Sequence, residues 1–125
     1  MSFRGLFVGI DRYRSPFIKR LNCACRDATA LYALFTDTLG AGGVRLLDDK
    51  ATKGNIVAQL EELTKCHEDD VVVLSFSGHG STTHELVTYD ASPTNLTGTC
   101  LSLEDLGTWF TKIPAKRLIC FLDCC

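Results

Sequence analysis

Apolar runs of strand length recur along the chain, and amphipathic segments separate them. The first runs cover residues 3–10 and 44–47, a valine-rich run covers 70–77, and a last one covers 116–123. Apolar runs without alternation are typical of parallel strands that are covered on both faces. The pattern therefore predicts four such strands, with a short additional strand around residues 86–89.

The segments between these runs have the apolar spacing of helices. The first extends from about Ala24 to Leu39, and Gly40 follows it as a C-cap signal. Thr52 is placed to cap a second helix, and Ser102 with Asp105 resembles a capping box before a third. The first segment is expected to face a core through Ala24, Ala28, Leu31, Phe35 and Leu39. The apolar positions of the second are Ile56, Leu60 and Leu63, and those of the third are Leu103, Leu106 and Phe110.

Strands that alternate with helices indicate right-handed βαβ units, and so an α/β fold with a mostly parallel sheet and helices on both faces. The 125 residues, 46% hydrophobic and 22% charged, suit one globular domain without a linker. In such sheets, chemistry collects at the carboxyl ends of the strands. Two of these ends carry reactive side chains: residues 77–80, with the sequence Ser-Gly-His-Gly, and residues 123–125, with the sequence Asp-Cys-Cys.

Charge and glycine placement argue against several binding functions. The net charge is −2, so no global field draws the protein to nucleic acid or to anionic membranes. The basic residues between Arg12 and Arg26 are interpreted as a solvated loop. The glycines at 40–43 end a predicted helix instead of following a strand, which excludes a dinucleotide loop. No apolar run is long enough to span a membrane. Together with the net charge, this means that neither nucleic acid nor a membrane is an expected partner.

Seven cysteines would indicate a disulfide framework in a secreted protein. The first ten residues lack a signal-peptide pattern, so we expect reduced thiols and a cytoplasmic location. Zinc is the other common use of cysteine in the cytosol. The pairs Cys23/Cys25, Cys66/His67 and Cys124/Cys125 lack the two-residue gap of a zinc knuckle, so structural zinc is the less favoured alternative and no metal site is expected.

Histidine and cysteine at neighbouring strand ends can form a nucleophile and an acid–base group. His79 lies between two glycines and can present its imidazole to a cleft, although a local hydrogen bond in a turn is the alternative role. A nearby histidine favours the thiolate that attacks a substrate. Alternation along the last strand points Asp123 and Cys125 to one face and Cys124 to the other, where a small core role is expected.

These two motifs resemble the histidine and cysteine motifs of the caspase fold, in which the histidine precedes the cysteine by about 50 residues. Residues 9–11 and 21–28 are similar to the N-terminal segment of metacaspases and their bacterial relatives, so the resemblance covers nearly the whole chain. The cysteine stands in Asp-X-Cys, as in metacaspases and paracaspases, and not in the Gln-Ala-Cys of animal caspases. The resemblance implies a caspase-like three-layer sandwich.

The resemblance also implies roles for individual residues. Cys125 would attack the scissile carbonyl, His79 would protonate the leaving amine, and the N–H groups of Gly80 and Cys125 would form the oxyanion hole. Asp27 and Asp123 map onto the carboxylates that bind Arg or Lys before the scissile bond. Purely structural roles remain as alternatives, because Asp27 lies in a first helical turn and Asp123 ends a strand.

Two family features have no clear counterpart in this sequence. Many metacaspases bind calcium through a dense acidic cluster, but only Asp90, Glu104 and Asp105 follow the histidine motif here. No cofactor is expected, and calcium activation is left open. Residues 1–125 correspond to the large catalytic subunit, so a small-subunit segment is the expected partner. We therefore expect these residues to be a catalytic domain truncated at its C-terminal end. Without the small-subunit segment, the domain should have an exposed sheet edge and little activity.

Three functions compete for this fold. The first is a cysteine endopeptidase that cleaves proteins or peptides after Arg or Lys. The second is a caspase-fold interaction or regulatory module whose cysteines are inert. The intact pair of His79 and Cys125 favours the enzyme. A flavodoxin-like nucleotide binder is a third interpretation, but the chain lacks a phosphate loop after the first strand, and Asp11 there would repel phosphate.

Overall fold

A parallel sheet forms the middle layer of the molecule. The computed structural model describes residues 2–124, and its main sheet has the strand order β2-β1-β3-β6. All three pairings are parallel, as the sequence predicts. The strands are β1 (Phe3–Gly9), β2 (Gly43–Leu47), β3 (Val71–Gly78) and β6 (Arg117–Cys124).

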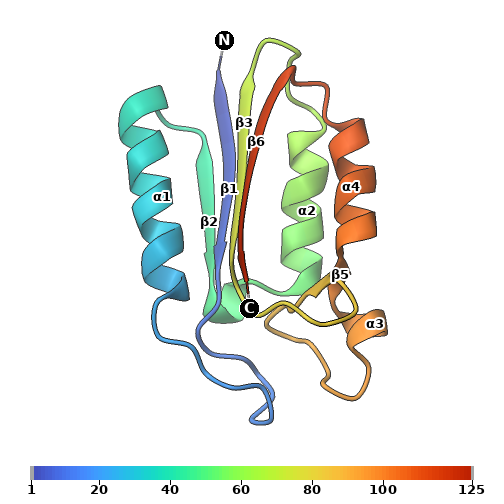
Figure 1. Ribbon diagram of the computed structural model, residues 1–125. Helices are drawn as coiled ribbons and strands as arrows, with labels where there is room; N and C mark the ends of the chain where they lie inside the picture. The colour runs from blue at the N-terminus through green and yellow to red at the C-terminus, as the bar shows by residue number, and fades with distance from the viewer. Residues whose placement is uncertain (1, 125) are drawn as a thin grey trace.

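Helices cover both faces of this sheet. Helix α1 (Ala24–Leu39) lies on one side, and helices α2 (Lys53–Leu63) and α4 (Leu103–Lys112) lie on the other, which gives three layers (Figure 1). The predicted mostly parallel sheet between helices is confirmed by this arrangement. Within residues 2–124, no helix combines the length and the apolar character needed to cross a lipid bilayer.

The predicted helix ends are confirmed in their local geometry. The Thr52 hydroxyl accepts the N–H of Asn55 at 3.2 Å, and the Ser102 hydroxyl accepts the N–H of Asp105 at 3.0 Å. Gly40 ends α1 with φ of 97°, a conformation that favours glycine, and its N–H donates to the Thr36 carbonyl at 2.9 Å. Short polar side chains and a glycine therefore set these boundaries, as the sequence indicates.

Short elements collect at the carboxyl ends of the parallel strands. The predicted strand at 86–89 is wrong in extent, because only Glu85 and Leu86 pair with a neighbouring strand and the N–H of Tyr89 donates instead to the Ala51 carbonyl. Two elements that the sequence analysis did not predict follow β4 (Glu85–Leu86): the small helix α3 (Leu96–Thr99) and the short strand β5 (Leu101–Ser102). A further unpredicted element, η1 (Asp48–Lys50), follows β2.

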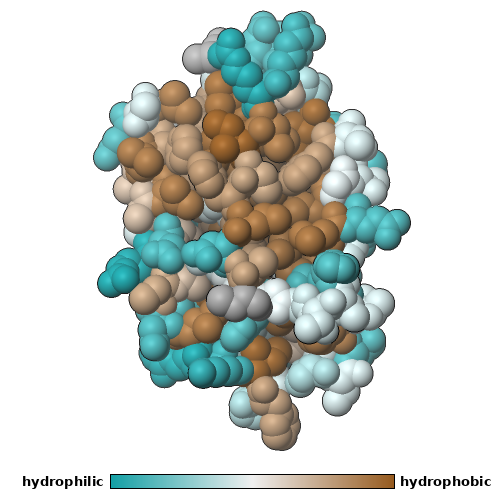
Figure 2. Space-filling model, in the orientation of Figure 1, coloured by the Kyte–Doolittle hydropathy of each residue, from teal (hydrophilic) through white to brown (hydrophobic). Residues whose placement is uncertain are grey.

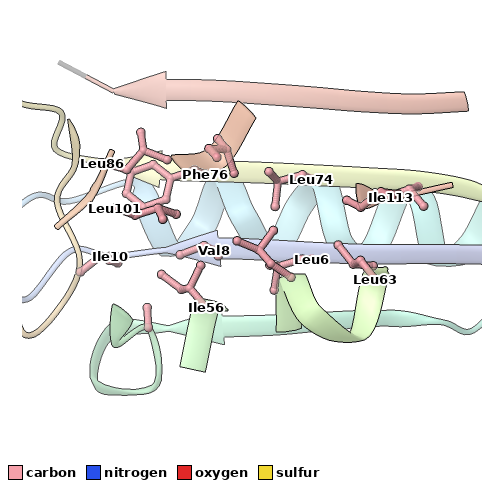
Figure 3. Close-up of a cluster of buried hydrophobic side chains, with 14 of the residues drawn as sticks. Leu6, Val8, Ile10, Ile56, Leu63, Leu74, Phe76, Leu86, Leu101 and Ile113 are labelled. Carbon is pink, nitrogen blue, oxygen red and sulfur yellow. The ribbon is translucent and has the colours of Figure 1, made fainter. Parts of the chain in front are cut away.

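Hydrophobic side chains fill both spaces between the layers. On the α1 side, Phe3 and Phe7 pack against Tyr32 and Phe35. Leu39, in the last turn of α1, is 37% exposed, so the predicted apolar face ends a turn early. Figure 3 shows the larger cluster on the other side, with side chains from β1, β3 and α2 such as Leu6, Val8, Leu74, Phe76, Ile56 and Leu63.

The strand β6 is the edge of the described sheet next to β3, and it is poorly covered. Its exposed apolar residues include Ile119, Phe121 and Leu122, each 40% exposed or slightly more. Hydrophobic surface extends along this face between α1 and α4 (Figure 2). The expected exposed edge is confirmed. The core role expected for Cys124 is wrong, because this residue is exposed at the end of the edge strand β6.

Candidate active site

The strand register brings the two predicted motifs to one place. In the pairing of β3 with β6, Ser77 lies opposite Asp123 and Gly78 lies opposite Cys124. His79 follows Gly78 directly, at the carboxyl end of the sheet where the connections after β1 and β3 also gather (Figure 1). Cys125, the predicted nucleophile and second oxyanion donor, lies outside the described residues. The structure therefore brings His79 to the end of the strand that carries Asp123.

The imidazole of His79 is fixed by a backbone carbonyl that sequence reasoning missed. The Nε2 atom lies 2.6 Å from the carbonyl oxygen of Lys19. A carbonyl can only accept a hydrogen bond, so Nε2 carries a hydrogen and Nδ1 of the neutral ring is left without one. Nδ1 is therefore the nitrogen that can exchange a proton with a thiol or a leaving amine.

Tyr13 fixes the backbone of the same histidine. Its hydroxyl accepts the N–H of His79 at 2.9 Å, and the two rings lie 5.3 Å apart. A side chain at Gly78 would meet this hydroxyl, since a Cβ there would lie 2.9 Å from the Tyr13 oxygen. Burial raises the pKa of Tyr13 to about 12, although the hydrogen bond from His79 opposes the shift. The hydroxyl therefore stays protonated at neutral pH.

Gly80 lies in a short antiparallel bridge that leaves its N–H outside the ladder. Gly80 is bridged to Leu86, and the two hydrogen bonds of this bridge run from the N–H of Val87 to the His79 carbonyl and from the N–H of Ser81 to the Glu85 carbonyl. Their lengths are 3.0 and 2.9 Å. Neither bond engages the N–H of Gly80, so this geometry is compatible with the predicted oxyanion donor.

Asp27 and Asp123 line the same hollows. A pocket of about 230 Å³ contains both carboxylates, together with Ser77 and Gly78 at the end of β3. A more open hollow of about 570 Å³ is lined by the same two residues and by apolar side chains of α1 and β6. The two acidic residues predicted for substrate binding therefore lie close together, next to the strand that leads to His79.

Close packing of α1 on β1 brings Asp27 to this position. A Cβ at Gly9 would lie 2.7 Å from the Ala24 carbonyl oxygen and 2.8 Å from the Ala28 Cβ. The missing side chain therefore lets the first turn of α1 approach the end of β1. The Asp11 carboxylate accepts the N–H groups of Ala24 and Cys25, at 2.8 and 3.3 Å, and so caps this turn from a distance.

Asp48 connects the same turn to the loop after β1. Its carboxylate accepts the N–H groups of Asp11 and Arg12, at 2.9 and 3.1 Å, and the thiol of Cys25 at 3.3 Å. Burial opposes ionisation of Asp48, but the hydrogen bonds from Arg12 and Asp11 outweigh it and lower its pKa. Burial, and then the hydrogen bond to Asp48, raise the pKa of Cys25 to about 12. The thiol of Cys25 is therefore a structural donor at neutral pH and not a thiolate.

Sequence reasoning missed three contributors to this site: Tyr13, the carbonyl of Lys19 and Asp48. A backbone carbonyl leaves no signal in a sequence, and Tyr13 and Asp48 lie far from His79 along the chain. Over residues 2–124, no group of three or more His, Cys, Asp or Glu side chains is arranged to hold a metal ion.

The chain is similar to proteins of known family and known structure. The model of the caspase domain family, Peptidase_C14, matches residues 4–125. No curated protein matches the chain. A crystal structure of a protein from Geobacter sulfurreducens is similar at 19% identity and a TM-score of 0.81, over 100% of this chain and 51% of that one. The structure of pro-sf-caspase-1 is similar at 14% identity and a TM-score of 0.72, over 99% of this chain and 46% of that one.

The two structural comparisons show a shared fold, and the chain spans about half the length of each of these proteins. The family model extends over nearly all of the sequence, including both strand-end motifs. The chain therefore belongs to the caspase domain family.

Proposed function

We propose that residues 1–125 form the large catalytic part of a metacaspase-like cysteine endopeptidase that cleaves proteins and peptides after Arg or Lys. The observation that carries the proposal is the shared pocket of Asp27 and Asp123 beside the strand that leads to His79. Two carboxylates in one pocket attract a guanidinium or ammonium group and repel an acidic side chain.

In the proposed reaction, the thiolate of Cys125 attacks the scissile carbonyl carbon and forms a carbon–sulfur bond. The N–H groups of Gly80 and Cys125 stabilise the oxyanion. The carbon–nitrogen bond then breaks while protonated His79 donates its Nδ1 proton to the leaving amine. Water, deprotonated by His79, hydrolyses the thioester, which releases the carboxylic acid and restores the thiol.

The Lys19 carbonyl supports this role of His79. Because the carbonyl accepts the hydrogen bond from Nε2–H, Nδ1 is the ring nitrogen left to exchange a proton with the thiol or the leaving amine. Tyr13 fixes the backbone from the other side. Preorganisation of this kind is what general acid–base catalysis requires.

A small-subunit segment is the proposed partner of the apolar edge at β6. Ile119, Phe121 and Leu122 have the composition of a buried strand but are exposed, and a further strand or layer would cover them. We also assign the protein to the cytoplasm, since the free thiols of Cys23, Cys25, Cys66, Cys100 and Cys120 suit a reducing compartment.

The test separates the two adjacent cysteines. In the protein extended through its small-subunit segment, Cys125→Ala should abolish hydrolysis of peptides with Arg before the scissile bond, while Cys124→Ala should retain most of it. A peptidyl electrophile ending in Arg should label wild type and Cys124→Ala but not Cys125→Ala. Labelling that persists in Cys125→Ala and disappears in Cys124→Ala would show that the nucleophile is the other thiol.

A further inference from the structure

A second pocket lies next to the end of β3 and contains neither of the two carboxylates. It has a volume of about 230 Å³, and His79, Gly80 and Ser81 form one of its walls. The acidic pocket, in contrast, is lined by Ser77 and Gly78. Four consecutive residues of the chain, 77–80, therefore lead from one pocket into the other.

The second pocket is mainly apolar. Ile18, Val87, Pro93 and Leu96 line it, and Phe17 lies beside them with 87% of its surface exposed. Its charged lining residue is Lys19, whose backbone carbonyl already binds His79. The pocket is smaller than typical small-molecule sites of roughly 300–1,000 Å³, so it suits a single side chain.

The pocket is built on packed structure. Ile18 and Leu96 pack against the buried cluster of Val87, Ala91 and Cys100. The loop that carries Ile18 is tied down by hydrogen bonds from Arg14 N–H to the Tyr89 carbonyl, 3.1 Å, and from Leu21 N–H to the Asp11 carbonyl, 2.8 Å. A preformed apolar hollow of this kind can bind a side chain without ordering a loop first.

We infer that this pocket binds the side chain of the substrate residue that follows the scissile bond, and that it selects an apolar residue there. The inference rests on the proposed function, in which His79 protonates the amine of that residue. The amine must then lie next to His79, and the attached side chain meets the pocket that His79 and Gly80 line. The basic residue before the scissile bond then occupies the neighbouring pocket of Asp27 and Asp123.

The chemistry of the two pockets makes opposite demands on the substrate. Asp27 and Asp123 attract positive charge in their pocket. In the second pocket, apolar walls gain free energy by burying apolar surface, and no lining residue offers a carboxylate to a second positive charge. The preferred cleavage point is therefore a basic residue followed by an aliphatic one, and dibasic sequences are poor substrates.

The experiment uses the protein extended through its small-subunit segment and quenched peptides with Arg before the scissile bond. The following residue is Leu, Val, Asp or Lys. We expect kcat/KM for Leu or Val to exceed that for Lys by at least about tenfold, in line with what apolar pockets discriminate. Equal kcat/KM across the four peptides would overturn the subsite.

A charge at the pocket mouth provides the matched test. Because Phe17 is exposed, Phe17→Glu should fold normally, and it should shift the Lys-to-Leu ratio of kcat/KM toward Lys by about two- to fivefold. Leu34→Glu places the same charge at a 60% exposed position on α1 outside this pocket and should leave the ratio unchanged. Equal ratios in Phe17→Glu and Leu34→Glu would contradict the assignment.

A coumarin amide of an Arg peptide separates the two levels of the proposal, since its leaving group is not an amino acid. If wild type hydrolyses the coumarin amide and shows no selectivity in the quenched series, the subsite alone is wrong. If wild type hydrolyses neither kind of substrate, the proposed peptidase function fails, and the subsite fails with it.

Discussion

The strands β3 and β6 run side by side and end together, but their surroundings differ. All eight residues of β3 are buried, whereas β6 is largely exposed although residues 118–122 form a continuous apolar run. The histidine after β3 is held by Tyr13 and by the Lys19 carbonyl. The comparison indicates that the described residues hold the histidine side of the site in place and leave the β6 side exposed, where we propose that a small-subunit segment packs.

The largest expected effect comes from the proposed small-subunit segment that would cover β6. The 125-residue chain alone should hydrolyse Arg peptides at least about a hundredfold more slowly than the protein extended through its small-subunit segment. The reason is that a small misplacement of a catalytic group lowers the reaction rate by about this factor. Steady-state assays of both proteins at equal concentration measure this. Equal turnover would show that β6 needs no cover for catalysis.

A second change weakens the β3 side. Tyr13→Phe removes the acceptor of the His79 N–H, and an unsatisfied buried donor costs about 1–3 kcal/mol. We expect kcat to fall by about tenfold with little change in KM. Tyr32→Phe is the control. It also removes a tyrosine hydroxyl, but the ring of Tyr32 packs against Phe7 on the α1 face of the sheet and does not contact His79. Similar kcat values for the two variants would mean that Tyr13 does not position the histidine.

A third change sharpens the contrast at β6. In the isolated chain, Ile119→Lys should reduce self-association, since Ile119 is 41% exposed on an edge strand and lysine blocks edge-to-edge pairing. Light scattering across a concentration series reports the mean mass. Leu34→Lys changes a more exposed residue on a helix and should have little effect. If both variants associate as wild type does, the edge is not what drives association.

The smallest expected effect is on alkaline stability. The pKa of Cys25 is raised from 9.0 and that of Tyr13 from 10.0, each to about 12, so both groups stay protonated in the folded chain after they ionise in the unfolded one. The free energy of unfolding should therefore fall as pH rises from about 9 toward 12. Urea unfolding of wild type, Cys25→Ala and the exposed Cys23→Ala measures this. Cys25→Ala should lose part of the dependence, and identical slopes for all three would contradict the linkage.

The sequence was sufficient where local patterning decides the outcome. The apolar runs predict β1, β3 and β6, and the hydroxyls of Thr52 and Ser102 predict helix starts. The meeting of Asp27 with Asp123 was expected only through the family resemblance, because the two lie almost a whole chain apart. The contacts of Tyr13, Lys19 and Asp48 depend on loop conformation, which no periodic pattern encodes.

The measurement that tests the central claim most directly compares matched fluorogenic peptides that differ only before the scissile bond, in wild type, Asp27→Ala and Asp37→Ala. Wild type should cleave after Arg and Lys and scarcely after Asp. Asp27→Ala should lower kcat/KM on basic peptides by well over tenfold, since removing one partner of a charge pair that the bound substrate covers costs about 2–5 kcal/mol, and should affect neutral peptides less. Asp37→Ala, an exposed change on the same helix, should behave as wild type. A wild-type preference for Asp would contradict the account, and an equal loss on basic and neutral peptides would reduce Asp27 to a structural residue.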